Sequence, residues 1–237
     1  MSEQHQEHES KHKSFYKEWI EPFLIAAIVA LFIRQFIVEA FKIPSGSMIP
    51  TLTIGDHLLV NKFIYGPRIP FTDSRIFVGK DPKRGEIIVF KYPEDEDKNF
   101  IKRIVGVPGD KIQIVKGTLF INDQAVVLNE VGSPEAAKQR GPSPVYYDKP
   151  KVYEEQLGNI MHKLQFLRDQ KTLDFGPRLV PQESVFVMGD NRDNSQDSRV
   201  WGFVKYNKIL GRALIIYWSW DGDDRWVRWE RLGTLIR

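Results

Sequence analysis

The sequence predicts a mainly β protein: an N-terminal single transmembrane helix followed by an antiparallel β-sheet domain with an inserted β-rich subdomain. An apolar segment at residues 19–38 is long enough to cross a bilayer, which takes about 20 residues in a helix. After residue 40 the chain changes to short runs rich in Val, Ile and Phe, bounded by Gly, Pro, Asn and Asp. Such runs are typical of antiparallel strands joined by turns.

The composition limits the classes of protein that remain. The chain has 237 residues, 42% hydrophobic and 27% charged, so it can bury a core and is neither disordered nor a multispan membrane protein. Its net charge of +3 is spread along the chain without a basic block, so we expect no nucleic-acid partner. The absence of cysteine excludes disulfides, zinc–thiolate sites and a Cys nucleophile. We expect no metal and no cofactor.

The N-terminal region divides into a tail and a helix. Residues 1–14 are polar and lack periodicity, so we expect a disordered tail. Residues 15–40 are expected to form the transmembrane helix, with Glu21 and Arg34 near its ends, where long side chains can reach the interface. A buried helix of a soluble protein is the alternative, because the uninterrupted apolar part, residues 23–33, is short.

The distribution of lysine predicts how the helix is oriented. Three lysines precede the apolar segment, whereas Lys42 is the only Lys or Arg in the 20 residues that follow it. Because positive charge is retained on the cytoplasmic side, the tail is expected in the cytoplasm. Residues 41–237 would then form an extracytoplasmic domain, which in a bacterium lies at the outer face of the plasma (inner) membrane.

The remainder of the chain is expected to be built from strands. The strand-like runs are residues 56–66, 85–93, 100–110, 111–123, 183–190 and 212–220. From about residue 117 to residue 182, Pro and Gly interrupt the chain often, and we interpret this segment as an inserted subdomain or a long loop. Within it, residues 153–169 fit either an amphipathic helix weakened by Gly158 or a strand, and the pattern leaves both open.

Two serines, Ser45 and Ser47, stand in the run PSGSMIP shortly after the apolar segment. A serine nucleophile needs a base, and histidine is the usual one. His57 is close in sequence, but we interpret it as an ordinary half-exposed strand position. A lysine can replace histidine when burial lowers its pKa so that the amine is neutral.

Lys102 is the candidate for such a lysine, because its neighbours in the run NFIKRIVGV are apolar. The alternative is a strand position that faces solvent. Since successive side chains of a strand alternate sides, we expect either Lys102 or Arg103 to face outward. The pattern alone favours neither interpretation of Lys102.

A third stretch, residues 188–204, interleaves carboxylates and hydroxyls with Arg192 and Arg199. A calcium loop that begins at Asp193 would need Gly at 198 and Glu at 204, and this chain has Ser198 and Val204 there. The remaining structural interpretation is a solvated charged turn.

Taken together, these stretches resemble bacterial type I signal peptidases, the membrane-bound Ser-Lys endopeptidases that remove signal peptides from exported preproteins. The resemblance extends from the apolar segment to about Trp218. It rests on the runs PSGSMIPTL, GDHLLVNKFIYG, RGEIIVFKYP, FIKRIVGVPGD and MGDNRDNSQDSR, in this order. Several such runs in the right order are far more specific than any one of them.

The resemblance implies a role for each matching residue. Ser47 would be the nucleophile and Lys102 its general base. Ser45 would lend its hydroxyl to the oxyanion hole, and Ser195 would hydrogen-bond the Lys102 amine. The residues that would hold the last stretch in shape are Asp190, Arg192, Asp197 and Arg199. Those that would line the substrate pockets are Phe41, Ile43, Pro44, Met48, Leu52, Phe100 and Ile101.

The resemblance also implies the setting of the protein. Its substrates would be the signal peptides of exported preproteins, cut after small-x-small sites, and membrane lipid would be its second partner. It would be a single-pass protein of the bacterial plasma membrane, with the catalytic domain outside. Some members carry two spans before the serine, where this chain has one. Nothing in the sequence indicates an oligomeric state.

Two other functions compete with this one. A catalytically inactive, membrane-anchored β domain that binds exported chains would use the same apolar cleft without needing a neutral lysine. A self-cleaving Ser-Lys repressor should lack the span and carry a DNA-binding region. This sequence instead predicts a span and shows no DNA-binding region.

Four of the six tryptophans lie close to the C-terminus, at positions 218, 220, 226 and 229. We expect them to pack in the core at strand ends. The alternative is that some of them rest in the lipid headgroup layer beside Arg225 and Arg228.

Overall fold

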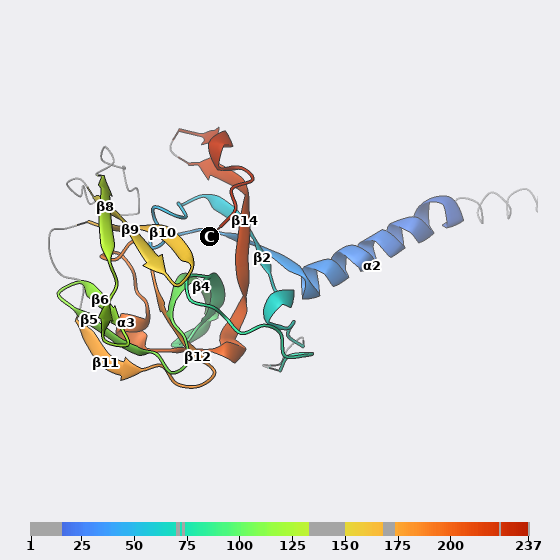
Figure 1. Cartoon of the computed structure of the whole chain (residues 1–237). Helices are drawn as coiled ribbons and strands as arrows, with labels where there is room; N and C mark the ends of the chain where they lie inside the picture. The colour runs from blue at the N-terminus through green and yellow to red at the C-terminus, as the bar shows by residue number, and fades with distance from the viewer. Residues whose placement is uncertain are drawn as a thin grey trace, which may run out of the picture.

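An apolar helix projects from a β domain (Figure 1). The structure, a computed structural model, describes residues 16–69, 72, 74–132, 150–167, 174–222 and 224–236. The predicted tail, residues 1–14, lies outside the described residues. A π-helical turn, η1 (Tyr16–Ile20), leads into α2 (Glu21–Phe36).

Together η1 and α2 are long and apolar enough to cross a membrane. The 21 residues have a mean hydropathy of 1.6, and none of them is buried against the β domain. The alternative of a buried soluble helix is therefore wrong. The predicted end of the helix at residue 40 is also wrong, because the chain enters strand β1 (Val38–Lys42), which pairs with β2 (Asp56–Asn61).

The larger part of the domain is one antiparallel sheet. Its strand order is β1-β2-β14-β3-β4-β12-β13, and β15 pairs with β14. The strands not yet introduced are β3 (Ile87–Tyr92), β4 (Asp95–Gly106), β12 (Ser184–Met188), β13 (Val204–Lys205), β14 (Ile209–Asp221) and β15 (Trp226–Val227). Short helical turns lie between these strands, at η2 (Phe63–Tyr65), α3 (Ser198–Trp201) and η3 (Tyr206–Lys208), and after the last of them, at η4 (Trp229–Arg231). The prediction of an antiparallel β domain is confirmed.

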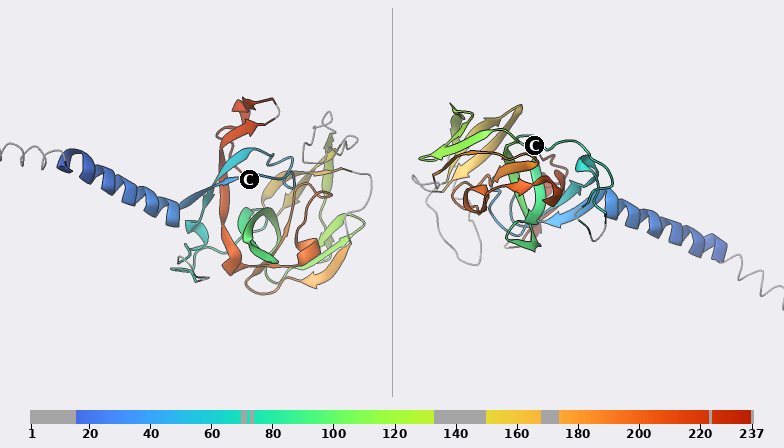
Figure 2. Two further views of the ribbon diagram at one scale, coloured as in Figure 1. Left: turned by 180° about the vertical axis from the view of Figure 1, so that it is seen from behind. Right: turned by 90° about the horizontal axis from the view of Figure 1, so that it is seen from below.

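Two smaller sheets lie on the side of the domain away from α2 (Figure 2). One has the order β11-β5-β6-β7 and the other β10-β9-β8. Their strands are β5 (Lys111–Val115), β6 (Thr118–Ile121), β7 (Gln124–Ala125), β8 (Leu128–Gly132), β9 (Lys151–Leu157), β10 (Ile160–Phe166) and β11 (Phe175–Leu179). The β-rich part thus begins at β5, before the predicted boundary at residue 117.

The segment that the sequence left open between helix and strand is a hairpin. β9 and β10 pair in antiparallel register, with Ile160 opposite Leu157. Gly158 lies in the connecting turn at φ +61°, a conformation that glycine adopts without steric cost. The residue that weakens a helix here forms the turn of a hairpin.

The C-terminal tryptophans do not pack in the core. Trp218 is 36% exposed and Trp226 is 66% exposed, and Trp220 and Trp229 lie between these values. They are carried by the outer end of β14 and by the β15 and η4 segment that folds back on it. The expectation of strand-end core packing is therefore wrong for all four.

Candidate active site

The turn after β1 places the Ser47 hydroxyl beside the Lys102 amine. Lys102 Nζ lies 2.8 Å from Ser47 Oγ, and both residues are buried, at 3% and 8% exposure. The second acceptor of the amine is the carbonyl of Ile101, at 2.9 Å. Ser45 Oγ lies 3.4 Å from Ser47 Oγ and is on the exposed side of the turn. A nucleophile, a candidate base and a second hydroxyl thus meet in one place.

Lys102 is buried because of its position in the middle of the main sheet. β4 lies between β3 and β12, with Lys102 opposite Ile88 and Arg103 opposite both Ile87 and Met188. Arg103, at 0% exposure, is as buried as Lys102. The expectation that one of the two faces outward is wrong, because both faces of this part of β4 are covered.

The two buried cations have different partners. Arg103 donates to both oxygens of Asp190, at 2.9 and 2.8 Å, and to the carbonyl of Gly85 at 2.7 Å. Lys102 instead contacts a hydroxyl and a carbonyl, with no carboxylate among the hydrogen-bond acceptors of its described surroundings. Burial lowers the pKa of Lys102 to about 8, although the charges of Asp197 and Asp190 oppose the shift. The neutral amine is therefore accessible near physiological pH.

The strand end and turn after β12 hold the nucleophile turn by its backbone. Asn191 donates from its backbone N–H to the Ser47 carbonyl and from its side chain to the Gly46 carbonyl, each at 3.0 Å. Gly189 lies against the same turn, where an added Cβ would come within 2.4 Å of the Ser47 carbonyl oxygen and 2.3 Å of Ser195 Oγ. Only glycine fits at position 189, because any side chain would push the two segments apart.

The four charged residues of the last motif form buried ion pairs. Asp190 binds Arg103, Arg192 Nη2 lies 2.5 Å from Glu155 Oε2, and Arg199 binds both oxygens of Asp197 at 2.8 Å. Burial alone would raise the pKa of Asp190 and of Asp197, but the adjacent arginines outweigh it and lower both. Because Asp190 and Asp197 are at most 1% exposed, the interpretation as a solvated turn is wrong.

Ser195 lies near the site, in the motif that follows β12. Its hydroxyl lies beside Gly189, close to the nucleophile turn. No hydrogen bond joins it to Lys102, since the two acceptors of that amine are Ser47 and Ile101. Its expected role in orienting the Lys102 amine therefore stays a prediction.

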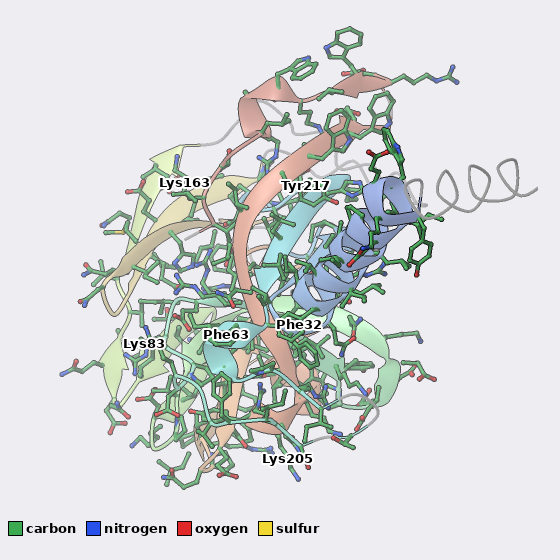
Figure 3. The ribbon with its side chains drawn as sticks, turned by 90° about the vertical axis from the view of Figure 1, so that its right-hand side faces the viewer. Phe32, Phe63, Lys83, Lys163, Lys205 and Tyr217 are labelled. Carbon is green, nitrogen blue, oxygen red and sulfur yellow. The ribbon has the colours of Figure 1, made fainter. Side chains whose placement is uncertain are left out.

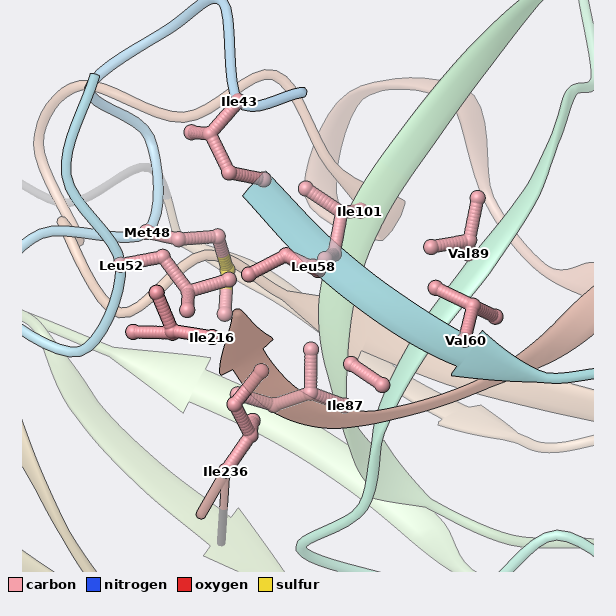
Figure 4. Packing of buried hydrophobic residues seen from close by; sticks show 11 residues of the cluster. Ile43, Met48, Leu52, Leu58, Val60, Ile87, Val89, Ile101, Ile216 and Ile236 are labelled. Carbon is pink, nitrogen blue, oxygen red and sulfur yellow. The ribbon is translucent and has the colours of Figure 1, made fainter. Parts of the chain in front are cut away.

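Four of the seven predicted pocket residues share one apolar cluster, which includes Met48, the residue after Ser47 (Figure 4). Ile43, Met48, Leu52 and Ile101 are buried in it, and Phe41 packs against it. Phe100 faces the other side of the sheet, where its ring stacks on Tyr92 with centroids 4.3 Å apart, and Lys102 Nζ lies 5.3 Å from it. Pro44 is exposed. Five of the seven residues thus belong to or pack against one apolar cluster, Phe100 lies on the Lys102 side of β4, and the role of all seven as a substrate pocket stays a prediction.

Several residues of the site were missed from the sequence. Thr51 donates to Asp190, and Asn191 binds the nucleophile turn. Glu155 and His162, from the β9–β10 hairpin, are buried beside the same motif, with His162 Nε2 3.3 Å from Glu155 Oε2. A buried Glu and His on opposite strands leave no local signal, because their partners lie far away in the sequence. Asn191 stood inside a noted motif.

His57 is a half-buried strand residue of β2 whose ring contacts Tyr217 at 6.0 Å between centroids. Its neighbour Leu58 points into the core instead. The interpretation of His57 as an ordinary strand position is confirmed.

Comparison with known proteins gives the family of this site. Residues 16–218 match the family described as signal peptidase, peptidase S26. The chain belongs to this family. The match spans the helix, the nucleophile turn, β4 and the motif after β12 in one continuous stretch.

Two curated relatives agree with this assignment. A signal peptidase I of Pseudomonas fluorescens is 40% identical over 210 residues, which cover 84% of this chain and 71% of that protein. A signal peptidase I of Pseudomonas aeruginosa is 38% identical with the same coverage. A crystal structure of a signal peptidase I from Enterococcus faecalis is 27% identical and covers 56% of this chain and 97% of that one, with a TM-score of 0.34. Membership of the S26 family makes this chain a peptidase, and an inactive binding domain finds no support.

Proposed function

We propose that this chain is a signal peptidase I that uses Ser47 as nucleophile and Lys102 as general base to remove signal peptides from exported preproteins. The observation that carries the proposal is the 2.8 Å contact between Lys102 Nζ and Ser47 Oγ, made where burial lowers the pKa of the amine. A base must lie within hydrogen-bond reach of the proton it takes and must be unprotonated at working pH. Lys102 meets both requirements.

The reaction proceeds through an acyl-enzyme. Ser47 Oγ attacks the scissile carbonyl carbon while the neutral Lys102 amine takes the hydroxyl proton. The tetrahedral intermediate expels the amine of the mature chain, which receives that proton from the Lys102 ammonium group. A water molecule then attacks the Ser47 ester with Lys102 again as base, releasing the signal peptide as a carboxylate and restoring the serine.

The oxyanion of the tetrahedral intermediate needs donors that are already in place. The exposed Ser45 hydroxyl, 3.4 Å from Ser47 Oγ, is one such donor, and the Ser47 backbone N–H is the other. Asn191 and Gly189 keep this turn in one geometry through their backbone contacts. The charged pairs of Asp190 and Asp197 fix the segment that carries those two residues.

Substrate selection follows from the apolar surroundings of Ser47. The apolar cluster of Ile43, Met48, Leu52 and Ile101 would accept small side chains before the scissile bond and exclude large ones by overlap. A signal peptide offers such small residues just beyond an apolar segment that sits in the bilayer. With α2 as the anchor and the tail in the cytoplasm, Ser47 would face this cleavage site at the outer surface of a bacterial plasma membrane.

The test is cleavage of a preprotein with an Ala-x-Ala site by the detergent-solubilised full chain, with product masses read to single-residue resolution. Wild type should cut after the second Ala, and Ser47→Ala and Lys102→Ala should be inert. The matched controls Ser74→Ala and Lys205→Ala change exposed residues and should leave the rate unchanged. Binding without cleavage by wild type, or cleavage by either active-site variant, would contradict the proposal.

A further inference from the structure

An exposed apolar patch lies on the connection between β2 and β3. Five large apolar residues there are at least 40% exposed, and Val78 reaches 90%. We call them the loop patch: Phe63, Ile69, Ile76, Phe77 and Val78. Single exposed apolar residues are ordinary on a protein surface, but a group of them on one connection marks an interaction surface. The rings of Phe63 and Phe77 are in contact, with centroids 5.1 Å apart, so the start of the connection meets its middle part.

Polar contacts behind the loop patch hold its backbone in place. Arg75 donates to the carbonyls of Gly66, Tyr206 and Ile209, and the last two contacts are 2.7 and 2.8 Å long. An added Cβ on Gly66 would come within 2.0 Å of the Phe77 carbonyl oxygen, so the two backbone segments are closely apposed. The apolar side chains therefore stay outside although their backbone is fixed to the domain.

The loop patch starts at the point where α2 ends. Lys62, the residue before Phe63, donates its backbone N–H to the Ile37 carbonyl at 2.9 Å, and its amine lies 3.5 Å from the Arg34 carbonyl. In Figure 3, Phe63 lies at the base of the projecting helix, on the side that also shows Phe32. One exposed cation, Lys80, borders this region, where its backbone N–H donates to the Ile64 carbonyl at 2.8 Å.

We infer that the loop patch rests in the interfacial layer of the bilayer, as a second membrane contact beside α2. The inference rests on the proposed membrane anchoring of α2. Lipid is the occupant that fits because the patch continues directly from the apolar helix and has the exposed Lys80 at its border, where anionic headgroups attract a cation. A single helix would leave the domain free to swivel. A second contact fixes the direction in which the Ser47 turn faces.

The test uses the absence of cysteine from the chain, which allows one label at a chosen site. The full-length Val78→Cys variant carries an environment-sensitive nitrobenzoxadiazole dye and is reconstituted in phosphatidylethanolamine and phosphatidylglycerol vesicles with brominated acyl chains. The matched control is Val127→Cys, a 69% exposed valine between β7 and β8, in the part of the domain remote from α2 (Figure 2).

The dye at position 78 should emit at shorter wavelength than the dye at position 127 and be quenched by the brominated lipid, whereas the control should not. Equal emission and no quenching at both positions would overturn the inference. So would a shorter wavelength at position 78 without lipid quenching, since a protein partner or a second copy would then cover the patch.

A functional arm separates this inference from the proposed activity. The double variant Phe77→Ser, Val78→Ser should lose cleavage of a vesicle-inserted preprotein several-fold, while cleavage of a short soluble peptide in detergent stays at the wild-type rate. Wild-type rates of the double variant on both substrates would contradict the membrane contact. If wild type cut neither substrate, the proposed function would fail, and the quenching result would still decide the membrane contact.

Discussion

The two faces of β4 carry neighbouring cations that the fold treats in opposite ways. On one face, Arg103 is saturated by both oxygens of Asp190 and by a backbone carbonyl. On the other, Lys102 has a serine hydroxyl and a carbonyl as its acceptors. A paired buried arginine keeps its charge and holds structure together, whereas a buried lysine without a bound carboxylate can give up its proton. Partners decide which cation is structural and which is available for chemistry.

The largest effect is expected when the cation on the Lys102 face of β4 can no longer lose its proton. Lys102→Arg keeps a cation beside Ser47 that cannot accept a proton, because the guanidinium stays protonated. We expect kcat/KM to fall by at least about 1,000-fold, as when a triad member is removed from a serine peptidase. The matched control Lys205→Arg, at an exposed site, should not change it. Wild-type activity in Lys102→Arg would remove the lysine from the base role.

On the Arg103 face of β4, a substitution should instead lower the free energy of unfolding. Asp190→Asn leaves Arg103 buried without its carboxylate, and breaking a buried pair in this way costs about 3–5 kcal/mol. Chemical denaturation of the full chain in detergent, followed by tryptophan fluorescence, measures the loss. The control Asp95→Asn removes the carboxylate of an exposed pair with Lys98 and should barely change the unfolding midpoint. Equal midpoints for the two variants would show that the Arg103 pair does not stabilise the fold.

A smaller loss of activity is expected at Ser45, the second hydroxyl beside the Ser47 and Lys102 pair. Ser45→Ala removes one proposed donor to the oxyanion and should lower kcat by roughly 100-fold with little change in KM. Single-turnover cleavage in detergent gives the rate, and Ser74→Ala serves as an exposed serine control. A wild-type rate in Ser45→Ala would show that the Ser45 hydroxyl is not a donor to the oxyanion.

The sequence was sufficient for the parts of this arrangement that are local. Apolar length predicted the helix, β-branched runs predicted the strands, and the motif order identified Ser47 and Lys102 as a pair. It could not show that Arg103 is buried, because alternation along a strand predicts opposite faces but not that both are covered. Nor could it place Glu155 and His162 beside Arg192, since the β9–β10 pairing that brings them there depends on contacts across the fold.

The exposed aromatic residues show the same limit. A run of Trp near the end of a chain is compatible with either core or surface, and only the fold of β14 and β15 places these rings outside. The end of the helix was misplaced for a related reason, because the apolar residues Val38, Ala40 and Phe41 are compatible with both a membrane span and a strand.

The measurement that tests the central claim most directly is the pH dependence of kcat/KM for cleavage of a short peptide by the full chain in detergent. The active form carries a neutral Lys102, whose pKa burial lowers to about 8. The rate should rise about tenfold per pH unit below this value and level off above it. Folding stability should rise with pH between about 8 and 10.4, where the unfolded chain still binds a proton that the folded chain has released. A profile that stays flat from pH 6 to 9, or one that rises only near the pKa of a free lysine, would contradict the account.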